Sequence, residues 1–248
     1  MDFNSIFSNA FRYPLSDYKK LLIVGIIVLL AEIPTVGFTF GLTTEFSILA
    51  VLYLISIVFG ILLAGYLVSV IIKGTQYSDD IPDLDFKKNF IDGLKSIVVS
   101  FIYLIIPTVI LFIVALLTGA IGASLNHIGA SIIIVVIVAI ILYIVFGILE
   151  VVALARFAYY DDWSEALHVG KVIDDAKGIG ILNIIIFLVM LLLVFLVLAV
   201  ISGIIGLIPF VGVIIVYLIV GSYAVLFYGD VLGLVYAEYA ENTLGKDE

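Results

Sequence analysis

Long apolar runs alternate with polar segments along the whole chain. A run of about 20 apolar residues crosses the roughly 30 Å hydrocarbon core of a bilayer. Six runs are this long: Leu21–Gly41, Phe46–Ile72, Ile97–Ala123, Ile128–Ala155, Ile179–Ile208 and Phe210–Tyr236. The breaks inside successive pairs of runs are short, whereas the breaks between pairs are longer and charged. This alternation predicts six transmembrane helices arranged as three helical hairpins.

An amphipathic segment precedes each predicted hairpin. Apolar residues at helical spacing form one face of each segment, which is typical of helices that lie in the membrane interface. The three faces consist of Phe3, Ile6, Phe7, Ala10 and Phe11, then Phe86, Phe90, Leu94 and Ile97, then Trp163, Ala166, Leu167, Gly170 and Ile173. We expect Phe7, Phe90 and Trp163 to anchor these helices, with Tyr159 and Tyr160 in an aromatic belt at headgroup level.

The chain repeats itself. Junctions that combine tyrosine and acid begin at Tyr77, Tyr159 and Tyr239, and a fixed period of about 80 residues indicates a structural repeat. Each unit has an even number of spans, so all units share one orientation, which predicts a parallel pseudo-threefold bundle. We therefore expect one all-α membrane domain over residues 1–248. Its approximate parts are units 1–80, 81–161 and 162–241 and a polar tail 242–248.

Composition supports the membrane assignment. The chain is 65% hydrophobic and 12% charged, with a mean hydropathy of +1.36, whereas a soluble domain is about 45–50% apolar and about 25% charged. The absence of cysteine excludes disulfides, thiolate catalysis and cysteine-based metal sites. The net charge of −9 argues against a nucleic-acid partner. We expect neither a metal site nor a cofactor.

The distribution of cations predicts the orientation. All eleven Lys and Arg residues fall on one side of the six-span layout, and the short hairpin loops contain none. By the positive-inside rule this predicts a multi-pass protein of the cytoplasmic membrane with both termini in the cytoplasm.

The junction RFAYYDDWSEALHVG, residues 156–170, has two readings. In the structural one, Arg156 ends a span and extends its head toward water. Asp162 caps the next helix, with Glu165 at the spacing of a capping box. A catalytic or calcium-binding role for these acids is the alternative.

Acids inside the apolar runs are the sharper candidates for function, because a charge in hydrocarbon is expensive. Glu32 lies near the middle of the first run and is followed by Pro34, which kinks helices. Glu150 and Asp230 occupy matching positions of the second and third units. Glu32, Pro34, Glu150 and Asp230 therefore form a candidate polar site for ions, protons or lipid headgroups. The alternative is that these acids are neutral or hydrogen-bonded and only fix helix packing.

The chain resembles a known family in its polar junctions. The span YKKLLIVGIIVLLAEIP and the segment DIPDLDFKKNFIDGLKSIVVSFIYLIIP are similar to the multi-pass membrane proteins of domain-of-unknown-function family 4013. The matching positions are Ile81, Pro82, Asp85, Phe90, Asp92, Gly93, Leu94 and Lys95, with Leu84 where that family's pattern has an aromatic residue. The family is also similar to membrane domains found beside glycerophosphodiester phosphodiesterases. The resemblance implies a membrane protein and assigns no catalytic residue.

Three functions remain open at this point. The spans contain no HExxH or GxSxG motif and no closely spaced carboxylate pair, so we expect a protein that is not an enzyme. The leading hypothesis is a membrane scaffold or accessory module that organises lipids or partner proteins, with membrane lipids and a membrane protein or a second copy as partners. The alternative is a transporter or channel for ions, small solutes or lipids that uses the intramembrane acids. An enzyme acting on lipid has the weakest support.

Overall fold

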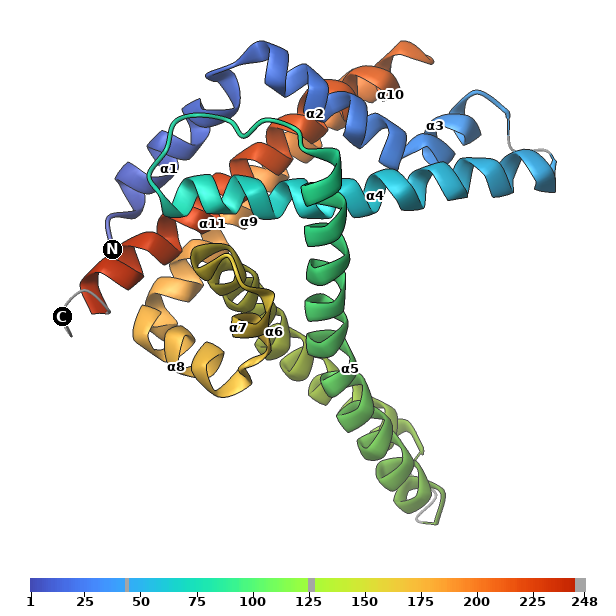
Figure 1. Cartoon of the computed structure of the whole chain (residues 1–248). Coiled ribbons are helices and arrows are strands. Elements are labelled where there is room, and N and C mark those ends of the chain that lie inside the picture. Colours follow the sequence, from blue (N-terminus) through green and yellow to red (C-terminus); the bar gives the residue numbers. More distant parts are fainter. Residues whose placement is uncertain (43–44, 125–127, 244–248) are drawn as a thin grey trace.

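Figure 1 shows a computed structural model of the chain, which describes residues 1–42, 45–124 and 128–243, without the side chains of 121–124, 128 and 130. All regular elements in these residues are helical. They are α1 (Phe3–Arg12), η1 (Tyr13–Leu15), α2 (Tyr18–Ala31), α3 (Ile33–Thr39), α4 (Phe46–Thr75), α5 (Phe86–Ser124), α6 (Ile128–Tyr160), α7 (Trp163–Leu167), α8 (Val169–Ile179), α9 (Ile181–Gly206), α10 (Val211–Ile215), η2 (Val216–Gly221) and α11 (Ser222–Thr243). Residues 244–248 of the predicted tail lie outside the described residues.

Five of the predicted spans are helices long and apolar enough to cross a membrane. These are α4, α5, α6, α9 and the joined segment Val211–Thr243, which contains α10, η2 and α11. The sixth predicted span is the pair α2 and α3, which is bent by 70°. The all-helical membrane class is therefore confirmed, with five spans or, if the bent pair counts as one, six.

The bend lies at the acid and proline singled out in the sequence. Glu32 separates α2 from α3, and Pro34 stands in the first turn of α3. Proline fits the first turn of a helix because its missing N–H has no partner there anyway. The hydroxyl of Ser56 on α4 donates to the carbonyl oxygen of Ala31 at the break. This side chain satisfies a carbonyl at the helix end, as interrupted membrane helices require.

Three helices pack together near the two termini. We call this region the terminal end and define it by the ends of α4, α6 and α11 at Thr75, Tyr160 and Thr243. The three helices meet there and share a core that contains Ile71, Phe157 and Val231.

Glycines allow these backbones to approach closely. A Cβ at Gly74 on α4 would lie 2.7 Å from the backbone oxygen of Asp230 on α11, so only glycine fits. The crossing of α4 and α5 is similar, because a Cβ at Gly65 would clash with the backbone of Asn89.

Away from this end the hairpins separate. In Figure 1 the outer part of the α5–α6 hairpin extends away from the other helices. We call this part, residues 104–124 and 128–145, the outer hairpin. Its large apolar side chains are exposed, among them Phe112, Leu117 and Ile133. Such side chains suit a lipid environment or the surface of another membrane helix.

The start of α5 differs from the sequence-based expectation. We expected a separate amphipathic helix in the membrane interface, but α5 is continuous from Phe86 to Ser124. Its polar face is the buried one: Asn89, Asp92 and Ser96 are covered, whereas Phe86 and Leu94 are exposed. The reason is the close crossing with α4, where the Asn89 amide donates to Ser69 Oγ at 2.7 Å.

The linker between α4 and α5, residues 76–85, is fixed to the helices around it. Tyr66 on α4 donates its hydroxyl hydrogen to the carbonyl oxygen of Pro82 at 2.9 Å. Lys20 on α2 donates to the carbonyl oxygen of Ile81 at 2.6 Å and forms an ion pair of 2.8 Å with Asp83. The linker therefore ties the first hairpin to the start of the second.

Candidate functional site

The best organised polar cluster surrounds Arg156, near the end of α6. Its guanidinium forms ion pairs with Asp175 on α8 at 2.6 Å and with Glu165 on α7 at 2.5 Å. Arg156 and Asp175 are about 5% and 4% exposed, so this pair is buried. We call Arg156, Glu165, Asp175, Tyr236 and Tyr239 the arginine cluster.

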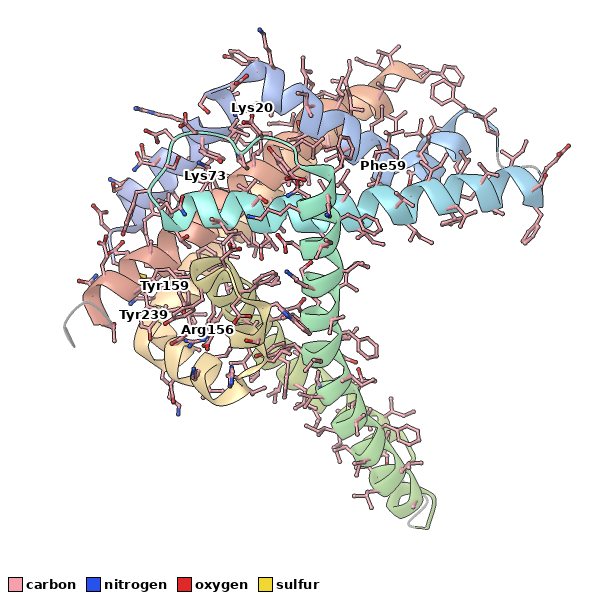
Figure 2. All side chains as sticks on the ribbon, viewed as in Figure 1. Lys20, Phe59, Lys73, Arg156, Tyr159 and Tyr239 are labelled. Carbon is pink, nitrogen blue, oxygen red and sulfur yellow. The ribbon has the colours of Figure 1, made fainter. Side chains whose placement is uncertain are left out.

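Two tyrosines of α11 complete the cluster. The hydroxyl of Tyr236 donates to Asp175 Oδ2 at 2.6 Å, and that of Tyr239 donates to Asp175 Oδ1 at 3.1 Å. Both carboxylate oxygens of Asp175 thus have strong partners, and Arg156 also lies 4.7 Å from the ring centroid of Tyr160. Figure 2 shows Arg156, Tyr159 and Tyr239 gathered at the terminal end, whereas Phe59 lies far along α4.

The local sequence explains how α7 and α8 present their acids. Asp162 accepts a hydrogen bond from the backbone N–H of Ser164 at 2.9 Å, which confirms its predicted role as the cap of α7. The expected capping box does not form, because the Glu165 carboxylate binds Arg156 and Lys171 instead. These two cations hold the pKa of Glu165 below its usual value.

The arginine cluster corrects the prediction for Arg156. We expected its head to extend toward water, but the guanidinium is enclosed and paired. An arginine buried without partners is very costly, so the two carboxylates decide where this side chain lies. The arrangement joins α6, α7, α8 and α11, and its polar atoms are occupied by one another. The cluster therefore links these helices to one another.

The predicted polar site is divided in the structure. Glu32 is exposed at the bend between α2 and α3 and accepts a hydrogen bond of 3.4 Å from Thr35, whereas Pro34 is buried. We expected Glu32 to face the interior of the bundle near mid-membrane, whereas the structure places it at an exposed position on a 70° bend.

The other two predicted acids differ in their exposure. Glu150 on α6 is half-buried. Asp230 on α11 is about 3% exposed, and its backbone lies against Gly74 of α4. The three acids therefore occupy an exposed, a half-buried and a buried position.

The five expected anchors have different surroundings. Tyr159 and Tyr160 are exposed, and Phe90 and Trp163 are half-buried. Phe7 does not face outward: its ring packs edge-on against Phe187 at 6.4 Å and Phe227 at 6.0 Å between centroids. The structure thus corrects the anchor role of Phe7, because α1 packs against α11 and this part of its apolar face is buried within the protein.

Two polar positions escaped the sequence analysis. Asp175 was missed because α7 and α8 break at His168, which shifts the buried face to Val172, Asp175 and Ile179. Asp175 lies three residues after Val172 and four before Ile179, and this spacing in the sequence places it on the same face of the helix as those apolar residues. Asp92 was assigned to an exposed polar face, yet its Oδ2 atom is buried without a hydrogen-bond partner in the described part of the chain.

Of the cavities that lie outside the arginine cluster, two adjoin the end of α1. One, of about 480 Å³, is an apolar groove between α9 and the η2–α11 segment. The other, of about 350 Å³, is polar and lies where α1 and η1 meet the linker; Asn9, Arg12, Tyr13, Ser16 and Asp79 line it. The two cavities have neighbouring residues of the chain, Phe11 and Arg12, in their linings.

Together these features define a class of protein: a multi-pass, all-helical membrane protein whose described polar residues mainly join helices. Comparison of the chain with models of known protein families identifies its family. The model of the family described as "Protein of unknown function (DUF4013)" matches residues 48–210, more than half of the chain, and the chain belongs to this family. The resemblance seen in the sequence is thereby confirmed. No curated protein and no solved structure matches the chain.

Proposed function

We propose that the protein is a membrane scaffold or accessory module that organises lipids or partner proteins and catalyses no reaction. The observation that carries this proposal is a contrast between two regions. The helices of the terminal end are joined by close packing and polar contacts, whereas the outer hairpin has uncovered apolar faces. Helices in lipid gain no hydrophobic free energy from each other, so uncovered faces are available to acyl chains or to another membrane helix. A second copy or another membrane protein is the expected protein partner.

The packing pattern supports the repeat architecture within this proposal. The second helices of the three hairpins, α4, α6 and α11, meet at the terminal end. The first helix of a hairpin packs on the second helix of another: α5 lies on α4, and α2 lies on η2. These are two of the three contacts that a parallel pseudo-threefold repeat requires. The exposed apolar residue Phe11 supports an interfacial position for α1, and Trp163 does so for α7.

Orientation forms a separate part of the proposal. We propose that the terminal end faces the cytoplasm of a cell bounded by the cytoplasmic membrane, because the cations concentrate there. Reporter fusions test this. Fusions at Glu45 and Pro209 should report the outside, as should one at His127, which lies outside the described residues. Fusions at Asp79, Asp162 and the C-terminus should report the inside, and one reversed pair would break the three-hairpin scheme.

Ion flux tests the scaffold proposal. Purified protein is reconstituted into vesicles loaded with a pH-sensitive dye, and proton and potassium fluxes are measured after a pH jump or with valinomycin. The scaffold predicts the same leak as empty vesicles for the wild type, for Glu32→Gln and for the matched control Glu45→Gln. A wild-type flux that Glu32→Gln abolishes and Glu45→Gln preserves rejects the scaffold proposal.

One observation favours a transporter or channel as the second candidate. Transporters place discontinuous helices at their binding sites, and the α2–α3 pair is interrupted at Glu32 with a bend of 70°. Under this hypothesis the carboxylate of Glu32 binds the transported ion or proton at the break. The same vesicle experiment decides between the candidates, with Asp230→Asn as a further variant: flux lost in both acid variants supports the transporter.

A further inference from the structure

The apolar groove beside α9 has the properties of a ligand site. Its volume of about 480 Å³ falls within the range of about 300–1,000 Å³ that is usual for small-molecule pockets. The lining comes from four elements and includes Phe11, Val194, Leu198, Ile201, Ile219 and Tyr223. The polar atom of this lining is the Tyr223 hydroxyl, and it donates to the carbonyl oxygen of Phe11 at 3.1 Å.

The shape and chemistry of the groove point to a flexible hydrocarbon chain. Water does not fill a cavity with such a lining, because it finds no polar partners there. A helix about 10 Å wide occupies this volume within about one turn, so the groove is too small for a partner helix. Both walls, α9 and the segment Val211–Thr243, are membrane spans. The acyl chain of a membrane lipid is therefore the occupant that fits.

A cation stands next to the groove. Arg12 follows Phe11 directly, is exposed, and forms no ion pair among the described residues. It lines the polar cavity together with Tyr13, Ser16 and Asp79. Guanidinium binds phosphate with two parallel hydrogen bonds. The hydroxyl groups of Tyr13 and Ser16 already donate to backbone carbonyl oxygens, so the guanidinium of Arg12 is the donor that an anion would bind. An anionic phosphate headgroup complements this position.

We propose that the protein binds one phospholipid specifically, with an acyl chain in the groove between α9 and the η2–α11 segment and its phosphate at Arg12. The proposal rests on the proposed function, since it names the lipid site that a lipid-organising scaffold uses. The two proposals can fail independently. Flux through vesicles tests the scaffold proposal, whereas lipid retention by named variants tests the lipid site in the groove.

The test is native mass spectrometry of the full chain in mild detergent, with phosphatidylglycerol and diacylglycerol of the same chains added in turn. Leu198→Trp fills the groove, and Leu196→Trp, on the exposed side of α9, is the matched control. We expect about tenfold lower phosphatidylglycerol occupancy for Leu198→Trp and wild-type occupancy for Leu196→Trp. Equal occupancy in both variants, whether high or low, overturns the groove assignment.

The headgroup is tested in the same way. Arg12→Gln should remove most of the preference for phosphatidylglycerol over diacylglycerol, whereas Lys19→Gln, a change at an exposed cation of α2, should preserve it. Equal preference in these two variants overturns the phosphate assignment.

A second measurement needs no variant. Phosphatidylglycerol with a diazirine on its acyl chain is cross-linked to the wild type, and the adducts are mapped. We expect the adducts to concentrate on α9, η2 and the start of α11, on residues that line the groove. Adducts spread evenly over the exposed outer hairpin and α9 overturn the proposal.

Discussion

The terminal end and the outer hairpin solve the problem of helix association in lipid differently. At the terminal end, glycines bring backbones together and buried polar groups find partners, as at the arginine cluster. In the outer hairpin the described helix contacts include two side-chain hydrogen bonds, from Ser131 to the carbonyl of Thr118 at 2.8 Å and between Thr108 and Tyr143 at 3.0 Å. Many of its large apolar side chains are exposed.

This difference indicates which region stabilises the fold and which region offers a surface for lipids or a partner. Lipid tails are as apolar as leucine, so a bare apolar surface contributes little to holding helices together, whereas close packing and polar contacts contribute more. The terminal end should therefore carry most of the free energy of unfolding. The outer hairpin should tolerate substitution and supply surface for lipids or a partner. Paired variants from the two environments should therefore differ in stability.

The largest effect is expected at Asp175. Asp175→Asn removes one charge of a buried pair and leaves Arg156 with Glu165 alone, which should lower the free energy of unfolding by about 3 kcal/mol or more. The neighbouring residue provides the control: Asp174 is exposed and lies 3.5 Å from Lys177. Asp174→Asn should change stability by less than about 0.5 kcal/mol. Thermal unfolding in detergent measures the stability of both variants. Equal losses of stability would contradict a stabilising buried ion pair at Asp175.

The next effect has opposite signs at two glycines of α4. Gly65→Ala places a methyl group against the backbone of Asn89 on α5, and overpacking of this kind costs about 1–3 kcal/mol. Gly60 has open space around it, so Gly60→Ala should stabilise the helix by about 0.5 kcal/mol, because alanine is the better helix former. The same unfolding assay reads both variants. Stabilisation by Gly65→Ala would show that α4 and α5 do not cross closely at this glycine.

The sequence predicts those features that the bilayer itself dictates. Span length follows from hydrocarbon thickness, and therefore the apolar runs locate α4, α6 and α9. The cap at Asp162 was also predictable, because it depends on neighbours two residues away. The break at Glu32 and Pro34 was anticipated as a kink, since proline lacks the N–H that continues a helix.

The remaining features depend on contacts between distant segments. Asp175 binds Arg156 and Tyr236, which are 19 and 61 residues away in the chain. The polar face of α5 is buried because α4 crosses it at Gly65, and no local pattern shows which helix lies there. Glu32 is exposed at the 70° bend between α2 and α3. Spacing along one helix does not determine any of these three outcomes.

A smaller effect separates two tyrosines of the second hairpin. Tyr103 is buried and donates to the carbonyl oxygen of Ala166 on α7 at 2.8 Å. Tyr103→Phe should cost about 1 kcal/mol through the lost hydrogen bond. Tyr143 in the outer hairpin is exposed, and Tyr143→Phe should cost less than about 0.5 kcal/mol. A larger loss at Tyr143 than at Tyr103, seen in the unfolding temperatures, would reverse the ranking of the two regions.

The smallest effect is a dependence of stability on acid at the terminal end. Arg156 and Lys171 lower the pKa of Glu165 in the folded protein, whereas the unfolded chain keeps the usual value of about 4.3. The unfolded state then binds more protons near pH 4, so the contribution of Glu165 is complete above that value and is lost as pH falls through the folded pKa. Unfolding temperatures between pH 3 and 7 should show this loss in the wild type and a shallower profile in Glu165→Gln. Glu45→Gln changes an exposed acid at the opposite end of α4 and should keep the wild-type slope. If Glu165→Gln also keeps that slope, the ion pairs of Glu165 do not contribute to the stability of the terminal end.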